Sequence, residues 1–190
     1  MARTVVETIE AEYRRYKALG EGAMAQVTDA ELCAVDTNTD NAIVAIVWHL
    51  AGNLASRFED FRTSDGEKPW RDRESEFDRR QVSRDEILAY WNRGWDSLFE
   101  AIVPLQDADL AGTVTIRRQA LRVDQALLRS VTHAAYHVGQ IVYLAKQFRG
   151  EAWESLSIPR GMSEAYNRRP ATETADAQAA AIRSRLGRQG

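Results

Sequence analysis

The chain contains three histidines, and two of them have the spacing of a helical metal-ligand pair. His133 and His137 are four residues apart, so on a helix their rings lie on one face, with Cβ atoms about 5–6 Å apart. Two neutral imidazoles placed in this way can bind one metal ion, at Zn–N distances of about 2.0–2.1 Å. His49 lies far away in the sequence, on a predicted helix that can face theirs. Three histidine ligands leave at least one coordination position open, which is typical of catalytic zinc sites, whereas structural sites have four protein ligands.

Histidines packed in the core are the alternative interpretation, since an isolated pair of this spacing also occurs without a metal. Two placements favour a shared site. At about 100° per residue, His49 lies more than about 90° from the centre of the apolar stripe of its helix, and Asn53 follows one turn later on the same flank. On the other helix, Ser130 and Gln140 share the flank of the two histidines. The spacing alone leaves both interpretations open.

The motif differs from that of zinc proteases, because Ala134 stands where that motif has its glutamate base. A general base would have to come from elsewhere, or the metal itself would activate the water. Gln140 and Asn53 are candidates for orienting the ligands or a bound water, with ordinary packing as the equal alternative.

Four amphipathic helices are predicted to position these residues. Capping-box spacings mark helix starts at Thr4 and Ser83, and a third such pair at Thr28 precedes a short turn. The helices are expected from Thr4 to Gly20 and Gly22, from near Asp40 through Phe61, from Ser83 to Pro104, and from Asp124 to Phe148. Weak alternation over 113–123 predicts a short hairpin. This pattern indicates an all-α fold, a four-helix bundle with a small hairpin insert before the last core helix.

Two stretches fall outside this helical pattern. Residues 62–84 have no periodicity, and their seven basic and six acidic residues interleave, which predicts a solvated, self-pairing loop that contacts the body through Trp70 and Phe77. Loops of this length are often lids or binding loops. Residues 168–190 are rich in Ala and Arg and predict a flexible tail, as a frayed helix or a disordered segment. The chain is therefore expected to form one domain over 1–167, followed by this tail.

Composition narrows the function classes. The net charge of −3 argues against a nucleic-acid partner that is bound through phosphate neutralisation. The single cysteine, Cys33, excludes an internal disulfide and fits a reducing compartment. The longest apolar run, Ala42 to Trp48, is far shorter than the roughly 20 residues that span a bilayer. A cytoplasmic protein with a small-molecule substrate, and without a membrane or nucleic-acid partner, is expected.

The histidine pattern resembles the DinB-like (DinB/YfiT) superfamily. The matching stretches are Val47–Leu50 around His49 and His133–Ile141, which reads His-x-x-x-His-x-Gly-Gln-Ile. The segments Gly66–Arg71 and Ser157–Gly161 resemble a subgroup still described as a domain of unknown function. The resemblance extends from about Val5 to Asn167.

The resemblance implies a four-helix bundle with nickel or zinc bound by His49, His133 and His137, and usually a homodimer. It also implies a metal-dependent hydrolase or a thiol S-transferase, in which the metal activates water or binds a small thiol as its thiolate. Arg160 is a candidate for holding a substrate carboxylate, with an exposed structural arginine as the alternative. The other function class is a metal-binding bundle without turnover, acting in stress response or through partner contacts. The five tryptophans and the apolar start of the second helix also favour a dimer.

Overall fold

The computed structural model describes residues 2–35 and 41–187. In these residues the protein is mainly helical, with one small two-stranded sheet, as the sequence predicted. The α-helices are α1 (Thr4–Met24), α2 (Asp29–Cys33), α3 (Ile43–Phe58), α4 (Arg84–Ile102), α5 (Val123–Arg149), α6 (Ser163–Arg168) and α7 (Ala175–Leu186). Three 3-10 helices are η1 (Glu74–Phe77), η2 (Asp107–Ala111) and η3 (Gly150–Ala152), and the strands are β1 (Thr113–Ile116) and β2 (Gln119–Arg122). None of the described helices is both long enough and apolar enough to cross a membrane.

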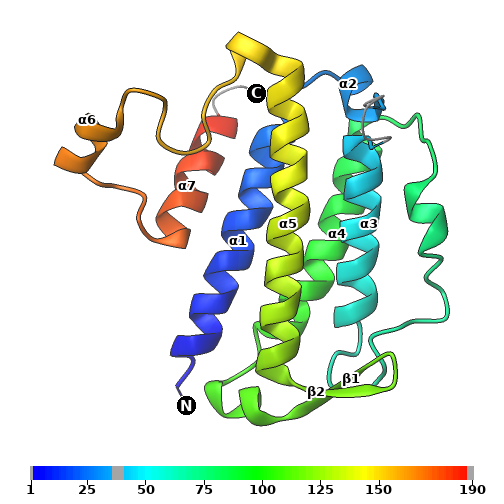
Figure 1. The fold of residues 1–190 in the computed structure, drawn as a ribbon. Helices are drawn as coiled ribbons and strands as arrows, with labels where there is room; N and C mark the ends of the chain where they lie inside the picture. The colour runs from blue at the N-terminus through cyan, green and yellow to red at the C-terminus, as the bar shows by residue number, and fades with distance from the viewer. Residues whose placement is uncertain (1, 36–40, 188–190) are drawn as a thin grey trace.

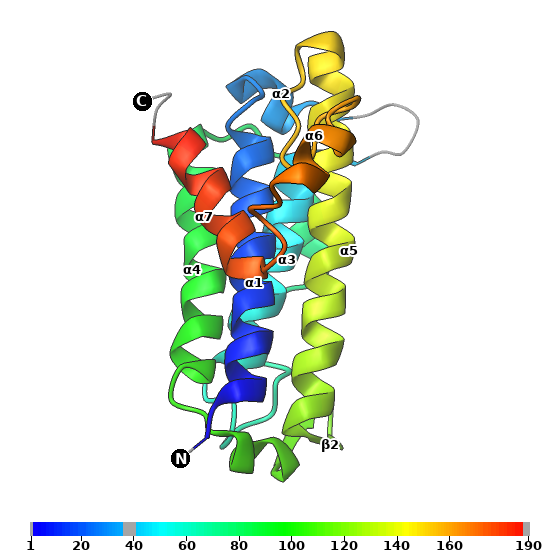
Figure 2. The same ribbon diagram turned by 90° about the vertical axis from the view of Figure 1, so that its left-hand side faces the viewer.

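The four long helices α1, α3, α4 and α5 lie side by side (Figure 1; Figure 2). Helix α3 contacts both α4 and α5, and α1 contacts α5 and α4. Large side chains fill the space between them, with Trp91 and Trp95 of α4 and Tyr13 of α1 fully buried. The Tyr13 hydroxyl donates a hydrogen bond to the Leu127 carbonyl of α5 at 2.9 Å, so this buried polar group is satisfied. The core therefore fixes the relative positions of α3 and α5, which carry the histidines.

Helix α1 differs from its predicted form at both ends. The capping box expected at Thr4 is not formed. Instead, Asp107 accepts hydrogen bonds from the backbone N–H groups of Val5 and Val6, each at 3.0 Å. The helix also continues past Gly20 and Gly22 to Met24.

These two glycines are positions of close packing rather than helix stops. A Cβ at Gly20 would lie 2.7 Å from the Trp91 ring, and one at Gly22 would lie 2.9 Å from Ile182. A glycine inside a helix costs about 1 kcal/mol relative to alanine, and here it allows neighbouring side chains to approach the helix backbone.

The other helix boundaries lie close to those predicted from the sequence. Both capping boxes predicted at Thr28 and Ser83 are present. Helix α5 extends only one residue beyond each predicted end. The predicted start near Asp40 lies outside the described residues, and α3 ends at Phe58, so Phe61 is buried in the turn that follows rather than on the helix.

The C-terminal region contains an ordered contact where a flexible tail was predicted. Helix α7 lies beside α1 (Figure 2), and its Ala179 and Ile182 are buried against Ala18. Thr174 caps its first turn by accepting from the N–H of Ala177 at 3.2 Å. The helix needs few large apolar residues because α1 offers small residues, Ala18 and Gly22, that allow close approach.

The segment between α3 and α4 (residues 59–83, called the α3–α4 segment below) is tied to the hairpin. The N–H of Gly66 donates to the carbonyl of Thr115 at 2.8 Å. The Asp65 carboxylate accepts from the N–H groups of Arg117 and Arg118, at 2.8 and 2.7 Å. These two arginines form the hairpin turn with φ of 52° and 62°, a left-handed conformation that is uncommon for residues other than glycine. Asp65 therefore holds the turn in shape, and backbone N–H bonds from Glu67, Arg118 and Arg117 lower the pKa of its carboxyl.

The α3–α4 segment contacts the helices through buried charged side chains as well as through Phe61. Trp70 and Phe77, the predicted anchors, are 46% and 45% exposed, although the Phe77 ring stacks on that of His49. Besides Phe61 and Gly66, the buried members are Lys68 and Glu76. The predicted self-pairing is present, and its buried ion pair lies beside the histidines.

Candidate metal centre

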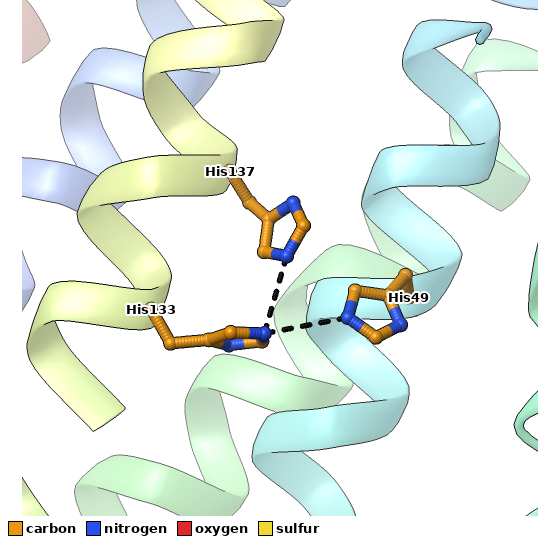
Figure 3. Close-up of side chains that lie close together, drawn as sticks. All are labelled: His49, His133 and His137. Carbon is orange, nitrogen blue, oxygen red and sulfur yellow. Dashed lines mark hydrogen bonds between the residues drawn. The ribbon is translucent and has the colours of Figure 1, made fainter. Parts of the chain in front are cut away.

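The three histidines converge between two of the long helices. His49 comes from the middle of α3, and His133 and His137 come from consecutive turns of α5 (Figure 3). The Nε2 atom of His133 lies 3.3 Å from Nε2 of His49 and 3.1 Å from Nε2 of His137. The cluster predicted from the sequence is therefore present, and it could hold a metal ion.

The spacing of these nitrogens matches the edges of a metal coordination shell. At metal–nitrogen distances of about 2.0–2.1 Å, two ligands are about 3.3 Å apart in a tetrahedral shell and about 2.9 Å apart at right angles. Two of the three separations, 3.1 and 3.3 Å, fall within this range. All three ligand atoms lie within 4.8 Å of one another, so the cluster could hold a transition metal.

In two of the rings, the nitrogen that points away from the cluster, Nδ1, forms a hydrogen bond with an acceptor oxygen. Nδ1 of His49 lies 2.9 Å from the Glu76 carboxylate, and Nδ1 of His137 lies 2.8 Å from the side-chain oxygen of Gln140. Because each oxygen can only accept, each Nδ1 carries the proton and each Nε2 presents its lone pair to the cluster. Metal-binding histidines commonly have such partners, which fix the tautomer and the ring orientation.

The three converging nitrogens cannot all be satisfied by one another. With Nδ1 protonated on His49 and His137, both rings direct lone pairs at Nε2 of His133, which carries at most one proton. Nδ1 of His133 is buried and has no hydrogen-bond partner among the described residues. A cation at the centre would satisfy all three lone pairs together, so the chemistry of this donor set suits a divalent metal.

The surroundings of His133 and His137 keep these two imidazoles in the neutral form that binds metal. Burial, together with the charges of His137 and His49, lowers the pKa of His133 to about 3. Burial also lowers the pKa of His137, against the opposing effect of its hydrogen bond to Gln140. Since only a neutral imidazole offers a lone pair, protons compete weakly for these two nitrogens near neutral pH.

Glu76 is itself held by a buried guanidinium. Arg71 donates to both carboxylate oxygens, at 2.7 and 2.9 Å, and it also reaches the Ser56 hydroxyl at 3.3 Å. Burial raises the pKa of Glu76, but hydrogen bonds from His49 and Arg71 outweigh it, so the net shift is downward and the carboxylate stays charged. Gly52 on α3 leaves room for this group, because a Cβ there would lie 2.4 Å from the carboxylate.

A cavity of about 430 Å³ opens beside the histidines. It lies between α3, α5, the hairpin and the α3–α4 segment, and both His49 and His133 form part of its wall. Its apolar wall is formed by Phe58, Phe61, Ile116, Leu121 and Ala126. Its other polar and charged lining residues are Asn53, Gln119, Ser130 and five arginines, Arg57, Arg71, Arg73, Arg117 and Arg129. A small molecule in this cavity would reach the histidine cluster directly.

A family model described as a protein of unknown function, DUF1572, matches residues 1–162 of the chain. The chain belongs to the DUF1572 family. The match includes α1 to α5, and so contains all three histidines, Glu76 and the hairpin, whereas α7 lies beyond it. No curated protein and no solved structure matches the chain.

The remaining sequence candidates of this DUF1572 protein are placed differently by the structure. Gln140 contacts His137, whereas Asn53 lines the cavity one turn after His49. Arg160 is exposed in the loop before α6, and it does not line the cavity. Glu76 was not predicted from the sequence, in which it is one carboxylate in a run of alternating charges. Its role depends on how the α3–α4 segment folds back onto α3, for which helical periodicity gives no indication.

Proposed function

We propose that this DUF1572 protein is a metal-dependent enzyme, a hydrolase or a small-thiol S-transferase, in which His49, His133 and His137 bind one zinc or nickel ion. The observation that carries the proposal is the convergence of three Nε2 atoms. Two of these atoms belong to rings whose Nδ1 atoms are hydrogen-bonded to Glu76 and Gln140. The described residues add no fourth His, Cys, Asp or Glu to this group. Three protein ligands with an open position is the pattern of catalytic rather than structural metal sites.

We also propose that the protein is DinB-like and that α1, α3, α4 and α5 form the four-helix bundle of that superfamily. Support comes from the placement of one histidine on α3 and two on α5, in the His-x-x-x-His-x-Gly-Gln-Ile pattern. The side-by-side arrangement of these four helices is consistent with such a bundle (Figure 1).

The residues of the site have separate tasks in this proposal. A bound divalent metal would supply Lewis-acid chemistry and lower the pKa of a water or thiol that reaches it. Glu76 and Gln140 hold the rings of His49 and His137 in orientation. The apolar side of the cavity limits the water around the substrate, and His49 and His133 line that cavity.

Metal analysis combined with an activity screen tests this function. The untagged protein is loaded with zinc or nickel and assayed for ester or amide hydrolysis, and for transfer of small thiols to electrophiles. The expected result is one metal ion per chain and an activity that disappears on chelation, returns with metal, and is absent from His137→Ala. One metal per chain without turnover in either screen would favour the non-catalytic bundle, and absence of bound metal would refute the site.

We further propose that the protein is a homodimer in the cytoplasm. One exposed face of α5 carries Leu128, Tyr136 and Tyr143, which are 54%, 64% and 69% exposed. The tryptophans give less support than the sequence suggested, because Trp91 and Trp95 are buried within the chain itself. Light scattering is expected to give twice the chain mass of 21.4 kDa at micromolar concentration, and the mass of a single chain would contradict the dimer.

A further inference from the structure

We propose that the cavity beside the histidines binds a small molecule with an anionic head, a carboxylate or a phosphoryl group, on an apolar body. The inference rests on the proposed function for the chemistry at the metal end of the cavity, whereas the anion site stands on the arginines alone. These arginines come from four elements: Arg57 from α3, Arg71 and Arg73 from the α3–α4 segment, Arg117 from the hairpin, and Arg129 from α5. No Asp or Glu is among the described lining residues.

Two of the five arginines have roles that the structure already explains. Arg71 is almost fully buried and donates to both oxygens of Glu76. Arg73 is half exposed, pairs with Glu74 at 2.9 Å, and lies over the ring of Phe77. Neither is needed for the anion site.

The other three arginines are not neutralised in full. Arg57 and Arg117 share one carboxylate, that of Glu67, at 3.1 and 2.8 Å. The Arg129 guanidinium has neither an ion pair nor a hydrogen bond with another described residue. Three guanidinium groups therefore have one directly paired carboxylate, which leaves positive charge and unused donors at the cavity wall. A planar guanidinium binds carboxylate or phosphate oxygens through paired N–H groups.

The arginines lie along the same two helices as the metal-ligand candidates. On α5, Arg129 precedes His133 by one turn, and on α3, Arg57 follows His49 by two turns. At a rise of 1.5 Å per residue, these steps correspond to about 6 and 12 Å along the helices. A ligand whose anionic head lies between these arginines would therefore place a group about 6–12 Å away at the histidine cluster.

The rest of the cavity suits the body of such a ligand. Its volume of about 430 Å³ lies within the range of small-molecule sites. The aromatic and aliphatic side chains of Phe58, Phe61, Ile116, Leu121 and Ala126 form its apolar wall.

The hairpin turn places Arg117 at the cavity. The positive φ values of Arg117 and Arg118 are those that a two-residue hairpin turn requires. The N–H of Arg117 donates to Asp65 at 2.8 Å, and its guanidinium donates to Glu67 at 2.8 Å. The backbone of Arg117 is therefore fixed by the hairpin and by Asp65.

The test is calorimetric titration of the metal-loaded full-length protein with three probes that share one ring: benzoate, phenylphosphonate and the neutral benzamide. At least one anion is expected to bind, and benzamide is expected to bind at least about tenfold more weakly, because charge-assisted hydrogen bonds are lost. Tighter binding of benzoate assigns a carboxylate ligand, and tighter binding of phenylphosphonate assigns a phosphoryl ligand. Equal binding of benzamide and the anions would overturn the inference.

Variants separate the arginine site from direct binding of the anion to the metal. Arg129→Met, which keeps an unbranched apolar stem but removes the guanidinium, is expected to weaken anion binding by about 10- to 100-fold without changing metal content. Arg129→Lys should give an intermediate loss, since it keeps the charge but not the paired donors. Arg160→Met, a change to an exposed arginine outside the cavity, should have no effect.

The outcomes distinguish failure of this inference from failure of the proposed function. Anion binding that requires the metal but is unaffected by Arg129→Met would overturn the inference and leave the metal site intact. Equal losses in Arg129→Met and Arg160→Met would also overturn it, because they would indicate a nonspecific charge effect. If the protein holds no metal, the proposed function fails, and the same titrations of the metal-free protein still decide the anion site.

Discussion

The pair of helices α3 and α5 and the α3–α4 segment contribute to the same site in different ways. The helices provide the three imidazoles, at positions set by regular backbone geometry. The irregular segment provides Glu76, which orients His49, and the buried Arg71 that holds Glu76. The comparison indicates that regular elements set which atoms converge, whereas the irregular segment sets ring orientation and local charge.

The largest expected effect comes from removing a helix-borne ligand. His133→Ala and His137→Ala should each lose most of the bound metal, because two nitrogens remain where three converge. Elemental analysis after dialysis against metal-free buffer measures this loss. Tyr143→Ala, an exposed position on the same helix, is the control and should keep one metal per chain. Full occupancy in both histidine variants would show that α5 does not hold the metal.

A smaller effect is expected from the irregular segment. Glu76→Gln preserves the shape of the side chain but removes the charge that accepts from His49 and pairs with Arg71, so metal affinity should fall by about 10- to 100-fold. Competition with a chelator of known affinity measures the change. Glu74→Gln, an exposed neighbour in η1, should leave the affinity unchanged. If both variants bind metal as tightly as the unmodified protein, the α3–α4 segment has no part in the site.

Substitutions of two polar helix residues should change the metal affinity by different amounts. Gln140→Ala removes the acceptor of Nδ1 of His137, so metal affinity should fall by about tenfold. Asn53→Ala should leave the affinity unchanged, because Asn53 lines the cavity. The same chelator competition compares them, and a larger loss for Asn53→Ala would reverse these assignments.

The smallest effect concerns the stability of the metal-free protein. The pKa of His133 is about 3 in the folded chain, below its ordinary value of 6.5, so the unfolded chain binds more protons between these pH values. This contribution to the free energy of unfolding is present above pH 6.5 and is lost as the pH falls toward 3.

Urea unfolding between pH 7 and 5, above the range of ordinary carboxylates, isolates this effect. His133→Gln should make the free energy of unfolding less dependent on pH in this range. An identical pH dependence in the variant would contradict the pKa assigned to His133.

The sequence predicted those parts of the molecule that depend on local periodicity. The spacing of His133 and His137 and the placement of His49 away from the apolar stripe of its helix indicated a shared cluster, and the capping boxes at Thr28 and Ser83 indicated helix starts. These features depend on the helical repeat of 3.6 residues per turn, which relates residues of the same helix to one another.

The features that the sequence did not predict depend on contacts between elements. In the sequence Gly20 and Gly22 resemble helix stops, whereas in the structure they allow the close approach of Trp91 and Ile182. Helix α7 lacks a strong apolar stripe and is ordered by the small residues that α1 offers. Glu76, Arg71 and Arg73 come from a charged stretch, and Arg57, Arg117 and Arg129 come from three other elements. Their folded positions are set by tertiary packing, so no local pattern distinguishes them from solvated charges.

The proposed site consists of one metal ion between three histidines, with a coordination position left open. Anomalous diffraction from crystals grown with zinc locates the ion itself. One anomalous peak per chain is expected, about 2.0–2.1 Å from the Nε2 atoms of His49, His133 and His137, with no fourth protein ligand. A zinc ion bound elsewhere, or bound in this cluster without His49, would contradict it.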